Sequence, residues 1–326
     1  MRSRLLILAL AALWTLSPAR ASAADTAAPA PIPVILDTDI GDDIDDTWAL
    51  TMLLKCPQLD VRLVTTSCGK AEYRAKIIAR LLTVAGRTNV AVGLGAGGRQ
   101  GAGAQQEWVK DYRLADYPGK VFDDGVGAVI DLIEKSPQTV TVISIGPLHT
   151  MAAVLERRPE VAAKANFAGM HGSVRVGYGG KKTPDAEYNV KANVAAAAKV
   201  LSAPWRQISI TPLDTCGLVG VSGPRFQALK DCKDPTVQAM LENYRIWARK
   251  PSLDQLRGSS TLFDTVAIYL ALPGERPLVE LETLPITVTK DGFTRIDDQG
   301  RRMSVAARWK DLDGYRDLLV KILTGK

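Results

Sequence analysis

Residues 32–46 read Ile-Pro-Val-Ile-Leu-Asp-Thr-Asp-Ile-Gly-Asp-Asp-Ile-Asp-Asp, so that six aspartates fall within ten positions. The apolar residues before the first aspartate are typical of a short buried strand, and the largely apolar residues 47–54 predict a helix. The aspartates therefore occupy a strand-to-helix turn. In an open α/β sheet, the turn at the carboxyl end of a strand is where ligands bind.

The density of this acidic run indicates a metal site. Carboxylates this close together raise one another's pKa unless a cation or backbone N–H groups offset the charge. The run contains no cysteine or histidine, and ligands that are all oxygen favour calcium or magnesium over zinc or copper. A helix dipole needs only one or two acids. The six acids are Asp37, Asp39, Asp42, Asp43, Asp45 and Asp46.

Composition limits the classes of protein and partner. With 326 residues, 46% of them hydrophobic, the chain is long enough for one large domain or two small ones. The net charge is +6, but the basic residues are scattered. The pairs Arg157-Arg158 and Arg301-Arg302 do not form the basic stripe interleaved with aromatics that nucleic-acid binding needs, so no nucleic-acid partner is expected.

The first residues have the features of a secretory signal peptide. Arg2 and Arg4 precede an apolar stretch at residues 5–16, and Ala21-Ser22-Ala23 is a small-residue cleavage site, so residues 1–23 are predicted to be removed. The apolar stretch is too short to span a bilayer, so no membrane anchor is expected after cleavage. Residues 24–33, rich in alanine and proline, predict a flexible lead-in. We expect export to a periplasm.

Beyond the acidic run, short apolar strands alternate with helical patterns, which predicts a mostly parallel sheet covered on both faces. The predicted strands are residues 61–66, 90–92, 139–145, 165–170 and 207–212, and the predicted helices are residues 72–84, 126–133, 150–155, 194–201 and 263–272.

The last part of the chain has a different pattern. Residues 278–289, 293–296 and 304–307 have antiparallel strand character and precede a helix that runs to Leu323. The predicted fold is therefore α/β, an open and mostly parallel sheet flanked by helices, with a small C-terminal antiparallel appendage. Residues 34–326 are expected to form a single catalytic domain.

Two other patterns are weaker. Residues 93–98 read Gly-Leu-Gly-Ala-Gly-Gly, which matches the GxGxxG pattern, but the glycine-rich residues 99–103 follow where a dinucleotide site needs a helix. A mobile loop near the pocket is the better interpretation. The four cysteines lack CxxC spacing, which disfavours zinc, and in an exported chain Cys68 and Cys216 are candidates for a disulfide.

The acidic run resembles the DxDxGxDD signature of the inosine-uridine-preferring nucleoside hydrolase family. The matching residues are Asp37-Thr38-Asp39-Ile40-Gly41 and, shortly after, Asp45-Asp46. Further matches follow in order and extend the resemblance from about Pro33 to Leu272. They are Val64-Thr65-Thr66, Ile145-Gly146-Pro147-Leu148, Gly169-Met170 with Gly172, Ala186-Glu187-Tyr188-Asn189 and Phe263-Asp264.

The resemblance implies hydrolysis of the N-glycosidic bond of ribonucleosides, giving free base and ribose, with Ca²⁺ as cofactor. Asp39 would bridge the calcium and the attacking water and act as general base. Asp46 and Asp264 would be calcium ligands, and the main-chain carbonyl of His149 would complete the ligand set. Calcium can lower the pKa of a bound water and chelate vicinal hydroxyls, and nearby negative charge stabilises an oxocarbenium-like transition state.

The resemblance also implies how the sugar is held. Asp45 would bond a ribose hydroxyl or the water, Glu187 and Asn189 would hold the remaining hydroxyls, and Met170 would lie against the ribose. The expected partner is thus a small-molecule ribonucleoside, and the family implies a homo-oligomer.

The chain departs from the family pattern in three places. The acidic loop is two residues longer, so Asp43 could take a role assigned to Asp45 or Asp46. Phe263 stands where many members have a histidine that protonates the departing base, which leaves His171 or Tyr178 as other candidate acids. Lys70 occupies a position that is commonly Asn or Asp.

Two other classes of function are compatible with parts of the sequence. A haloacid-dehalogenase-like phosphatase also begins with a strand and a DxD motif, although the pair Asp45-Asp46 has no role in that mechanism. An exported, non-catalytic nucleoside or sugar binder would keep the metal site and lose activation of the leaving group, and Phe263 favours this alternative.

Overall fold

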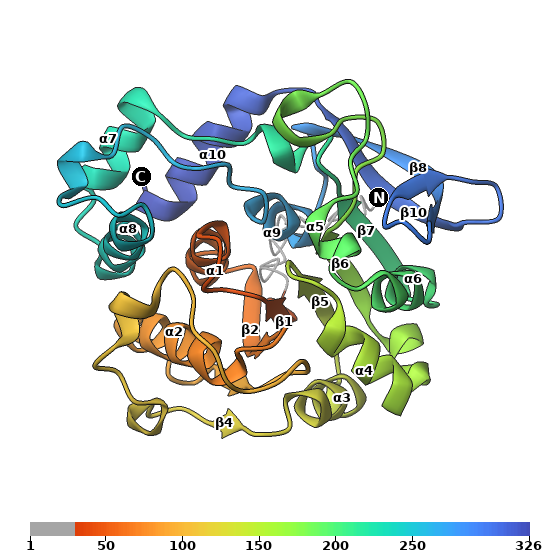
Figure 1. The fold of residues 1–326 in the computed structure, drawn as a ribbon, viewed down its shortest axis with the longest axis horizontal. Helices are drawn as coiled ribbons and strands as arrows, with labels where there is room; N and C mark the ends of the chain where they lie inside the picture. The colour runs from red at the N-terminus through yellow and green to blue at the C-terminus, as the bar shows by residue number, and fades with distance from the viewer. Residues whose placement is uncertain (1–29) are drawn as a thin grey trace, which may run out of the picture. The chain divides into compact units, whose positions relative to one another are not determined.

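The strands described in the structure form a single sheet that is parallel over most of its width. The computed structural model describes residues 30–326 (Figure 1). In this part of the chain the strand order is β4-β3-β2-β1-β5-β6-β7-β10-β8-β9. The strands are β1 (Ile32–Thr38), β2 (Leu59–Thr66), β3 (Ala91–Gly93), β4 (Val121–Phe122), β5 (Thr141–Ser144), β6 (Asn166–Met170), β7 (Gln207–Thr211), β8 (Val279–Val288), β9 (Thr294–Ile296) and β10 (Arg301–Trp309).

The predicted α/β class and the C-terminal antiparallel part are both confirmed. Strand β10 pairs in parallel with β7 through Ser304 and Ser209, and it also pairs antiparallel with β8. Strand β9 then pairs antiparallel with β8 at the edge. The C-terminal strands therefore extend the main sheet.

Helices cover both faces of this sheet because strand side chains alternate between the faces. Val34 and Leu36 belong to one core cluster, whereas Ile35 belongs to the other. Figure 1 shows α3, α4 and α6 together on one side of the central strands and α1 and α9 on the other. The helices are α1 (Asp45–Leu54), α2 (Ala71–Val84), α3 (Gly125–Lys135), α4 (His149–Arg157), α5 (Tyr188–Lys191), α6 (Val194–Ser202), α7 (Gly223–Asp231), α8 (Pro235–Trp247), α9 (Thr265–Ala271) and α10 (Leu312–Thr324).

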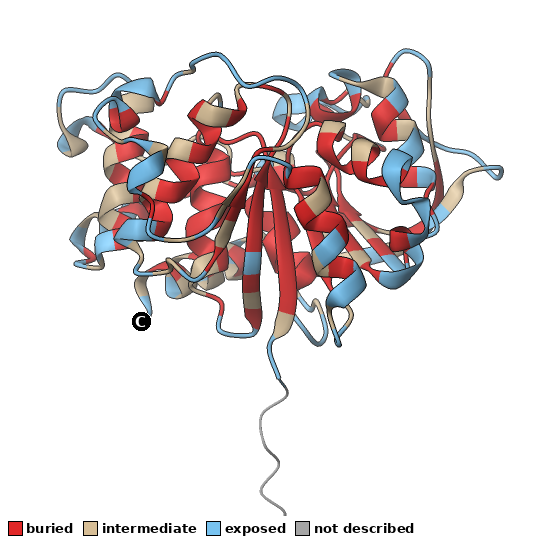
Figure 2. Ribbon diagram, turned by 90° about the horizontal axis from the view of Figure 1, so that it is seen from below, coloured by how far each residue is buried: buried red, intermediate tan, exposed pale blue. Residues whose placement is uncertain are grey.

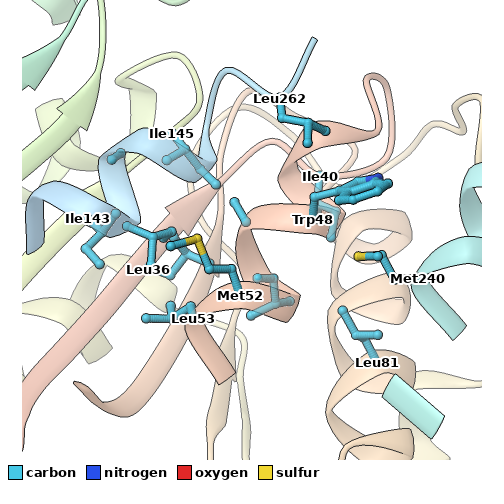
Figure 3. Packing of buried hydrophobic residues seen from close by; sticks show 14 of the residues in the cluster. Leu36, Ile40, Trp48, Met52, Leu53, Leu81, Ile143, Ile145, Met240 and Leu262 are labelled. Atoms are coloured by element: carbon cyan, nitrogen blue, oxygen red, sulfur yellow. The ribbon is translucent and has the colours of Figure 1, made fainter. Parts of the chain in front are cut away.

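Helix α1, which begins within the acidic run, is buried on nearly all sides. All of its residues except Leu54 are buried, which is typical of a helix that is apolar all round. Figure 3 shows Trp48 and Met52 of this helix between the strands and the neighbouring helices, with Leu36 on one side and Met240 on the other. Figure 2 shows the same layering, with buried strands at the centre and exposed residues on loops and outer helix faces. This packing fixes the position of the acidic turn.

The described residues begin at residue 30, and all four cysteines lie among them. The predicted signal peptide and most of the lead-in, up to residue 29, lie outside them. Strand β1 begins at Ile32, so the prediction that residues 32 and 33 belong to a flexible lead-in was wrong. All four cysteines are free, so no Cys68–Cys216 disulfide forms. Within residues 30–326, no helix has the length and apolar character needed to cross a membrane.

Candidate active site

The acidic turn lies where the strand order changes direction. From β1 the chain proceeds through β2 and β3 on one side of the sheet, whereas β5, β6 and β7 lie on the other side. The loops that follow β1 and β5 therefore diverge and leave a crevice at the carboxyl ends of these strands, which is the usual ligand site of open α/β sheets. Asp39 directly follows β1, and Ile145 directly follows β5.

A pocket of about 250 Å³ opens at this crevice and has a chemically mixed lining. Carboxylates from the acidic run, together with Asp264 and Glu187, line it along with three aromatic rings. The lining residues are Asp39, Asp42, Asp43, Asp45, Asp46, Ile145, Met170, Tyr178, Glu187, Tyr188, Asn189, Phe263 and Asp264. Carboxylate oxygens can bind a cation or sugar hydroxyls, while aromatic rings suit a flat apolar group.

Three of these carboxylates are close enough to hold one metal ion. One oxygen each from Asp45, Asp46 and Asp264 lies within 4.8 Å of the other two. The first two residues begin α1 and the third directly precedes α9, and these two helices are in contact. Because these acids come from the N-terminal ends of two different helices, the dipole of one helix does not explain why they lie together.

The electrostatics of this cluster indicate that it needs a cation. Burial, followed by the charge of Asp43, raises the pKa of Asp45 to about 8. Burial and the neighbouring aspartates also raise the pKa values of Asp46 and Asp264 well above their usual range. A bound cation would reverse these effects and keep all three carboxylates ionised. Because every nearby donor is an oxygen, the site fits a hard divalent ion.

Asp39 lines the same pocket but lies outside this close cluster of three. Burial raises its pKa to about 6, and the nearby guanidinium of Arg74 opposes that rise. The loop after β5 approaches Asp39 closely, because a Cβ atom at Gly146 would lie only 2.6 Å from its Oδ1. A glycine at position 146 is therefore needed for the carboxylate of Asp39 to occupy this place.

The residues predicted to hold the sugar are also brought to the pocket. Glu187 accepts hydrogen bonds from the backbone N–H groups of Gly172, Asn189 and Val190, and burial raises its pKa to about 7. The side-chain amide of Asn189 donates to the carbonyls of Ile145 and Met170, each at 3.0 Å. Both side chains are thus held rigidly by backbone groups while they line the pocket.

Comparison with known proteins identifies the family of the chain. The sequence model of the inosine-uridine preferring nucleoside hydrolases matches residues 34–317. The chain belongs to this family. It is therefore a hydrolase that acts on N-glycosyl bonds, as the resemblance implied, and the phosphatase alternative has no support.

The relatives of this nucleoside hydrolase include proteins named pyrimidine-specific ribonucleoside hydrolase RihA. The one from Enterobacter sp. (strain 638) is 25% identical over 313 residues, which cover 80% of this chain and 95% of the relative. The one from Salmonella newport (strain SL254) is 28% identical over 314 residues, covering 80% and 96%.

Solved structures share the fold. A plant nucleoside hydrolase, PpNRh1, superimposes with a TM-score of 0.76 at 22% identity, covering 91% of this chain and all of the other. A purine-preferring ribonucleoside hydrolase from Gardnerella vaginalis superimposes with a TM-score of 0.71 at 19% identity, covering 90% and 98%.

In this nucleoside hydrolase, His149 is not among the residues that line the pocket. It begins α4, four positions after Ile145, and it borders a separate surface hollow. The prediction concerned the main-chain carbonyl of His149 and not its imidazole, so this ligand stays a prediction. The carbonyl of Ile145, which directly follows β5, accepts a hydrogen bond from the side-chain amide of Asn189.

His171, the predicted alternative acid, also lies outside the pocket lining. Its Nε2 is 3.2 Å from the carbonyl oxygen of Gly146, its Nδ1 is buried without a partner, and its ring packs against Phe167. Burial lowers the pKa of His171 to about 4. It is therefore a neutral, buried residue behind the loop after β5.

This burial predicts a pH dependence of stability. The folded state keeps His171 neutral, whereas the unfolded state binds a proton near pH 6.5, so stability is lost as the pH falls from about 6.5 towards 4. His171→Gln removes this titration and keeps a donor for the Gly146 carbonyl. At about pH 4.5, relative to about pH 7.5, the wild type should lose roughly 2 kcal/mol more than the variant in urea unfolding. Parallel stability curves for the two proteins would contradict this role.

The sequence patterns did not identify Arg74, a buried residue of α2 that donates hydrogen bonds to the acidic turn. Its side chain is 1% exposed and donates to backbone carbonyls of the loops after β1 and β2 and to the Asp42 carboxylate. The donors reach the carbonyl oxygens of Asp39, Ile40 (2.9 Å), Cys68 (3.4 Å) and Gly69 (2.9 Å) and the Oδ2 atom of Asp42 (2.9 Å). Helical spacing could have revealed it, because positions 74, 78 and 81 share one buried face of α2.

Replacing this arginine should destabilise the fold strongly. Arg74→Met leaves buried carbonyls without donors, so we expect a loss of about 3–5 kcal/mol in the free energy of unfolding. Arg74→Lys should recover only part of it, since an ammonium group cannot reproduce the planar fork. Arg225→Met is the control, because this arginine bonds several groups at the surface. Equal losses in urea unfolding of Arg74→Met and Arg225→Met would show that burial of Arg74 does not matter.

The glycine-rich segment after β3 is a loop, as predicted, and no helix opens directly from it. It packs against the loop after β2, where the N–H of Gly69 donates to the carbonyl of Ala96 and the N–H of Ala71 donates to that of Gly98. At Gly95, a Cβ atom would lie 1.9 Å from the carbonyl oxygen of Thr66. These glycines therefore allow two loops to approach each other closely.

Proposed function

We propose that this chain hydrolyses ribonucleosides to free base and ribose with the aid of one divalent cation, which we take to be Ca²⁺. The observation that carries the proposal is the buried group of Asp45, Asp46 and Asp264 in a pocket that aromatic rings also line. Such a pocket offers charge for a sugar and a metal and an apolar surface for a base.

We assign the metal ligands to three acids that line the pocket and to one main-chain carbonyl. Asp46 and Asp264 would bind the ion directly, Asp39 would reach it from the end of β1, and the main-chain carbonyl of His149 at the start of α4 would complete the ligand set. A bound cation supplies charge that neutralises these acids, lowers the pKa of a coordinated water and chelates vicinal hydroxyls. Asp45 would face the water or a ribose hydroxyl.

The remaining roles follow from the positions of the side chains. Asp39 would accept the proton of the attacking water, since it is a buried carboxylate with a raised pKa. Glu187 and Asn189 would hold the sugar hydroxyls, and Met170 would lie against the ribose. The surrounding negative charge would stabilise the oxocarbenium-like transition state. Removal of the 2′-hydroxyl from the substrate should therefore reduce turnover strongly.

Removal of the metal is the direct test of this proposal. After treatment with EDTA and dialysis, release of ribose should fall by at least about 100-fold and return on addition of Ca²⁺. Calcium at about 100 times its dissociation constant should also stabilise the fold by about 2.7 kcal/mol, measured as a rise in Tm. Full activity in EDTA would contradict the proposal. Binding of a nucleoside with calcium present but without release of ribose would favour the non-catalytic binder.

The base, the assembly and the location are further proposals. Relatives named pyrimidine-specific and a structure named purine-preferring both resemble this chain, so a panel of both kinds of nucleoside is the suitable assay. We propose export with cleavage after Ala23 and a homo-oligomeric assembly. Mass spectrometry of the periplasmic fraction would test the cleavage, and light scattering after size exclusion would test the assembly.

A further inference from the structure

The pocket lining contains no histidine that could protonate a departing base, and its apolar surface includes three aromatic rings. The rings that line it are those of Phe263, Tyr178 and Tyr188. Both histidines of the chain, His149 and His171, lie outside the lining. Help for the leaving group must therefore come from another donor in the pocket or be absent.

Most other donors near the pocket are already engaged. The side-chain amide of Asn189 donates to two backbone carbonyls. Lys70 and Arg74 lie near the acidic turn, and both are paired with Asp42, at 2.7 and 2.9 Å. Neither of these cations belongs to the residues that line the pocket. Two phenolic hydroxyls remain, those of Tyr178 and Tyr188.

The hydroxyl of Tyr178 is held in place with its proton available. Its oxygen accepts a hydrogen bond of 2.9 Å from the backbone N–H of Tyr188, so its own O–H is free to donate in another direction. Its ring contacts that of Phe263 edge to face, with centroids 6.2 Å apart and planes at 79°. Tyr178 is 37% exposed and Tyr188 is 56% exposed, and among the hydrogen bonds of the described residues the hydroxyl of Tyr178 alone of the two has a partner that fixes its position. Tyr178 is thus the better positioned donor.

The loop that carries Tyr178 is itself held by Asp185. This carboxylate accepts from the backbone N–H of Tyr178 at 2.9 Å and from the ammonium of Lys181 at 2.7 Å. The backbone N–H of Asp185 donates to the hydroxyl of Ser173 near the end of β6. These bonds tie the loop to the sheet, so the phenol is oriented before any ligand binds.

We propose that Tyr178 donates a hydrogen bond to the departing base and that Phe263 and Tyr178 together form the leaving-group subsite. This inference rests on the proposed function and adds a catalytic residue to it. In the step, the water oxygen bonds to C1′ of the ribose and its proton passes to Asp39. The C1′–N bond breaks with its electron pair left on the base, and the base, stabilised by the Tyr178 hydrogen bond, then takes a proton from solvent.

The mechanism predicts a loss that depends on the leaving group. Tyr178→Phe should lower kcat/KM for uridine and inosine by about 100-fold, the typical effect of one donor aimed at developing charge. For p-nitrophenyl ribofuranoside, whose leaving group is stable as an anion, the loss should be less than about 3-fold. Tyr112→Phe is the control for tyrosine substitution, because its hydroxyl bonds Thr83 at an exposed site.

Several results would overturn the inference. If Tyr178 had a purely structural role, its loss would lower kcat/KM for both kinds of substrate equally. An equal loss, or no loss, therefore contradicts the proposed hydrogen bond to the base. A selective loss in Tyr188→Phe instead of Tyr178→Phe would assign the role to the other hydroxyl. Wild-type activity on the p-nitrophenyl riboside alone would show that the base receives no help, while the metal and sugar roles would stand. Activity on neither substrate would overturn the proposed function as well.

Discussion

Asp39→Asn should reduce the rate of ribose release by at least about 10³-fold, because the variant has no carboxylate to accept the proton of the attacking water. The amide is nearly isosteric with the carboxylate and carries no charge, so the fold should be retained. In EDTA the variant should be at least as stable as the wild type, since a buried carboxylate with a raised pKa is removed. Steady-state kinetics and urea unfolding measure the two effects.

The matched control for this variant is Asp123→Asn. The side chain of Asp123 is 84% exposed and pairs with Arg99 at the surface, so its loss should leave both rate and stability nearly unchanged. Retention of more than about a tenth of the wild-type kcat in Asp39→Asn would rule out the general-base role. Loss of activity together with a large loss of stability would point to a structural role.

Asp264→Asn should separate metal binding from folding. Affinity for Ca²⁺ should fall by more than the roughly 100-fold typical of a group that only orients a ligand, and activity at low calcium should fall with it. In EDTA, however, the variant should have the same Tm as the wild type or a higher one. The charges of Asp45 and Asp46 oppose ionisation of Asp264, and the substitution removes this repulsion.

Asp264→Asn should thus weaken calcium binding without lowering the Tm in EDTA, and general damage to the fold would not give this combination. Calcium should raise the Tm of the wild type and of Asp254→Asn, an exposed control, but should have little effect on the Tm of Asp264→Asn. Calorimetric titration gives the affinities directly. An unchanged calcium response in Asp264→Asn would show that the ion binds elsewhere, and a much lower Tm in EDTA would show that Asp264 is needed for the fold.

The sheet and the position of the acidic turn could be predicted from local patterns. The apolar run from Ile32 to Leu36 and the buried helix that follows it are both clear in the sequence, and they fix the turn at the carboxyl edge of the sheet. The chain's order of strands and helices also matches the predicted parallel architecture. What the patterns did not predict is that β10 enters the sheet beside β7, because that depends on long-range pairing between residues about a hundred positions apart.

Three helices, the four-residue α5 and the longer α7 and α8, were not predicted, although α8 has clear signals. Asp234 accepts from the N–H groups of Thr236 and Val237, and Pro235 stands at the first helical position, which together are typical of a helix N-terminus. Helix α7 has a mostly polar composition with little periodicity. Composition alone could not distinguish it from a loop.

The six aspartates show how far residue type alone identifies a site. Asp37 lies at the end of β1, where burial raises its pKa to about 8 and the hydroxyls of Thr65 and Ser144 bond it. Asp42 pairs with cations at the rim. Only the structure separates these from Asp45 and Asp46, which meet Asp264 from the other end of the chain. The residue pattern alone predicted a metal site at the turn, and only the resemblance to the family linked Asp46 to Asp264; neither predicted that Asp45 lies in the same close cluster.

The central claim is that the acidic pocket makes this chain a metal-dependent hydrolase of ribonucleosides. The most direct measurement is release of free ribose from a panel of purine and pyrimidine ribonucleosides by the purified chain, with Ca²⁺ and with EDTA, beside a parallel assay of phosphate release from the matching nucleotides. We expect calcium-dependent release of ribose from at least one nucleoside and no release of phosphate. Release of phosphate without ribose, or release of neither while calcium still binds, would contradict it.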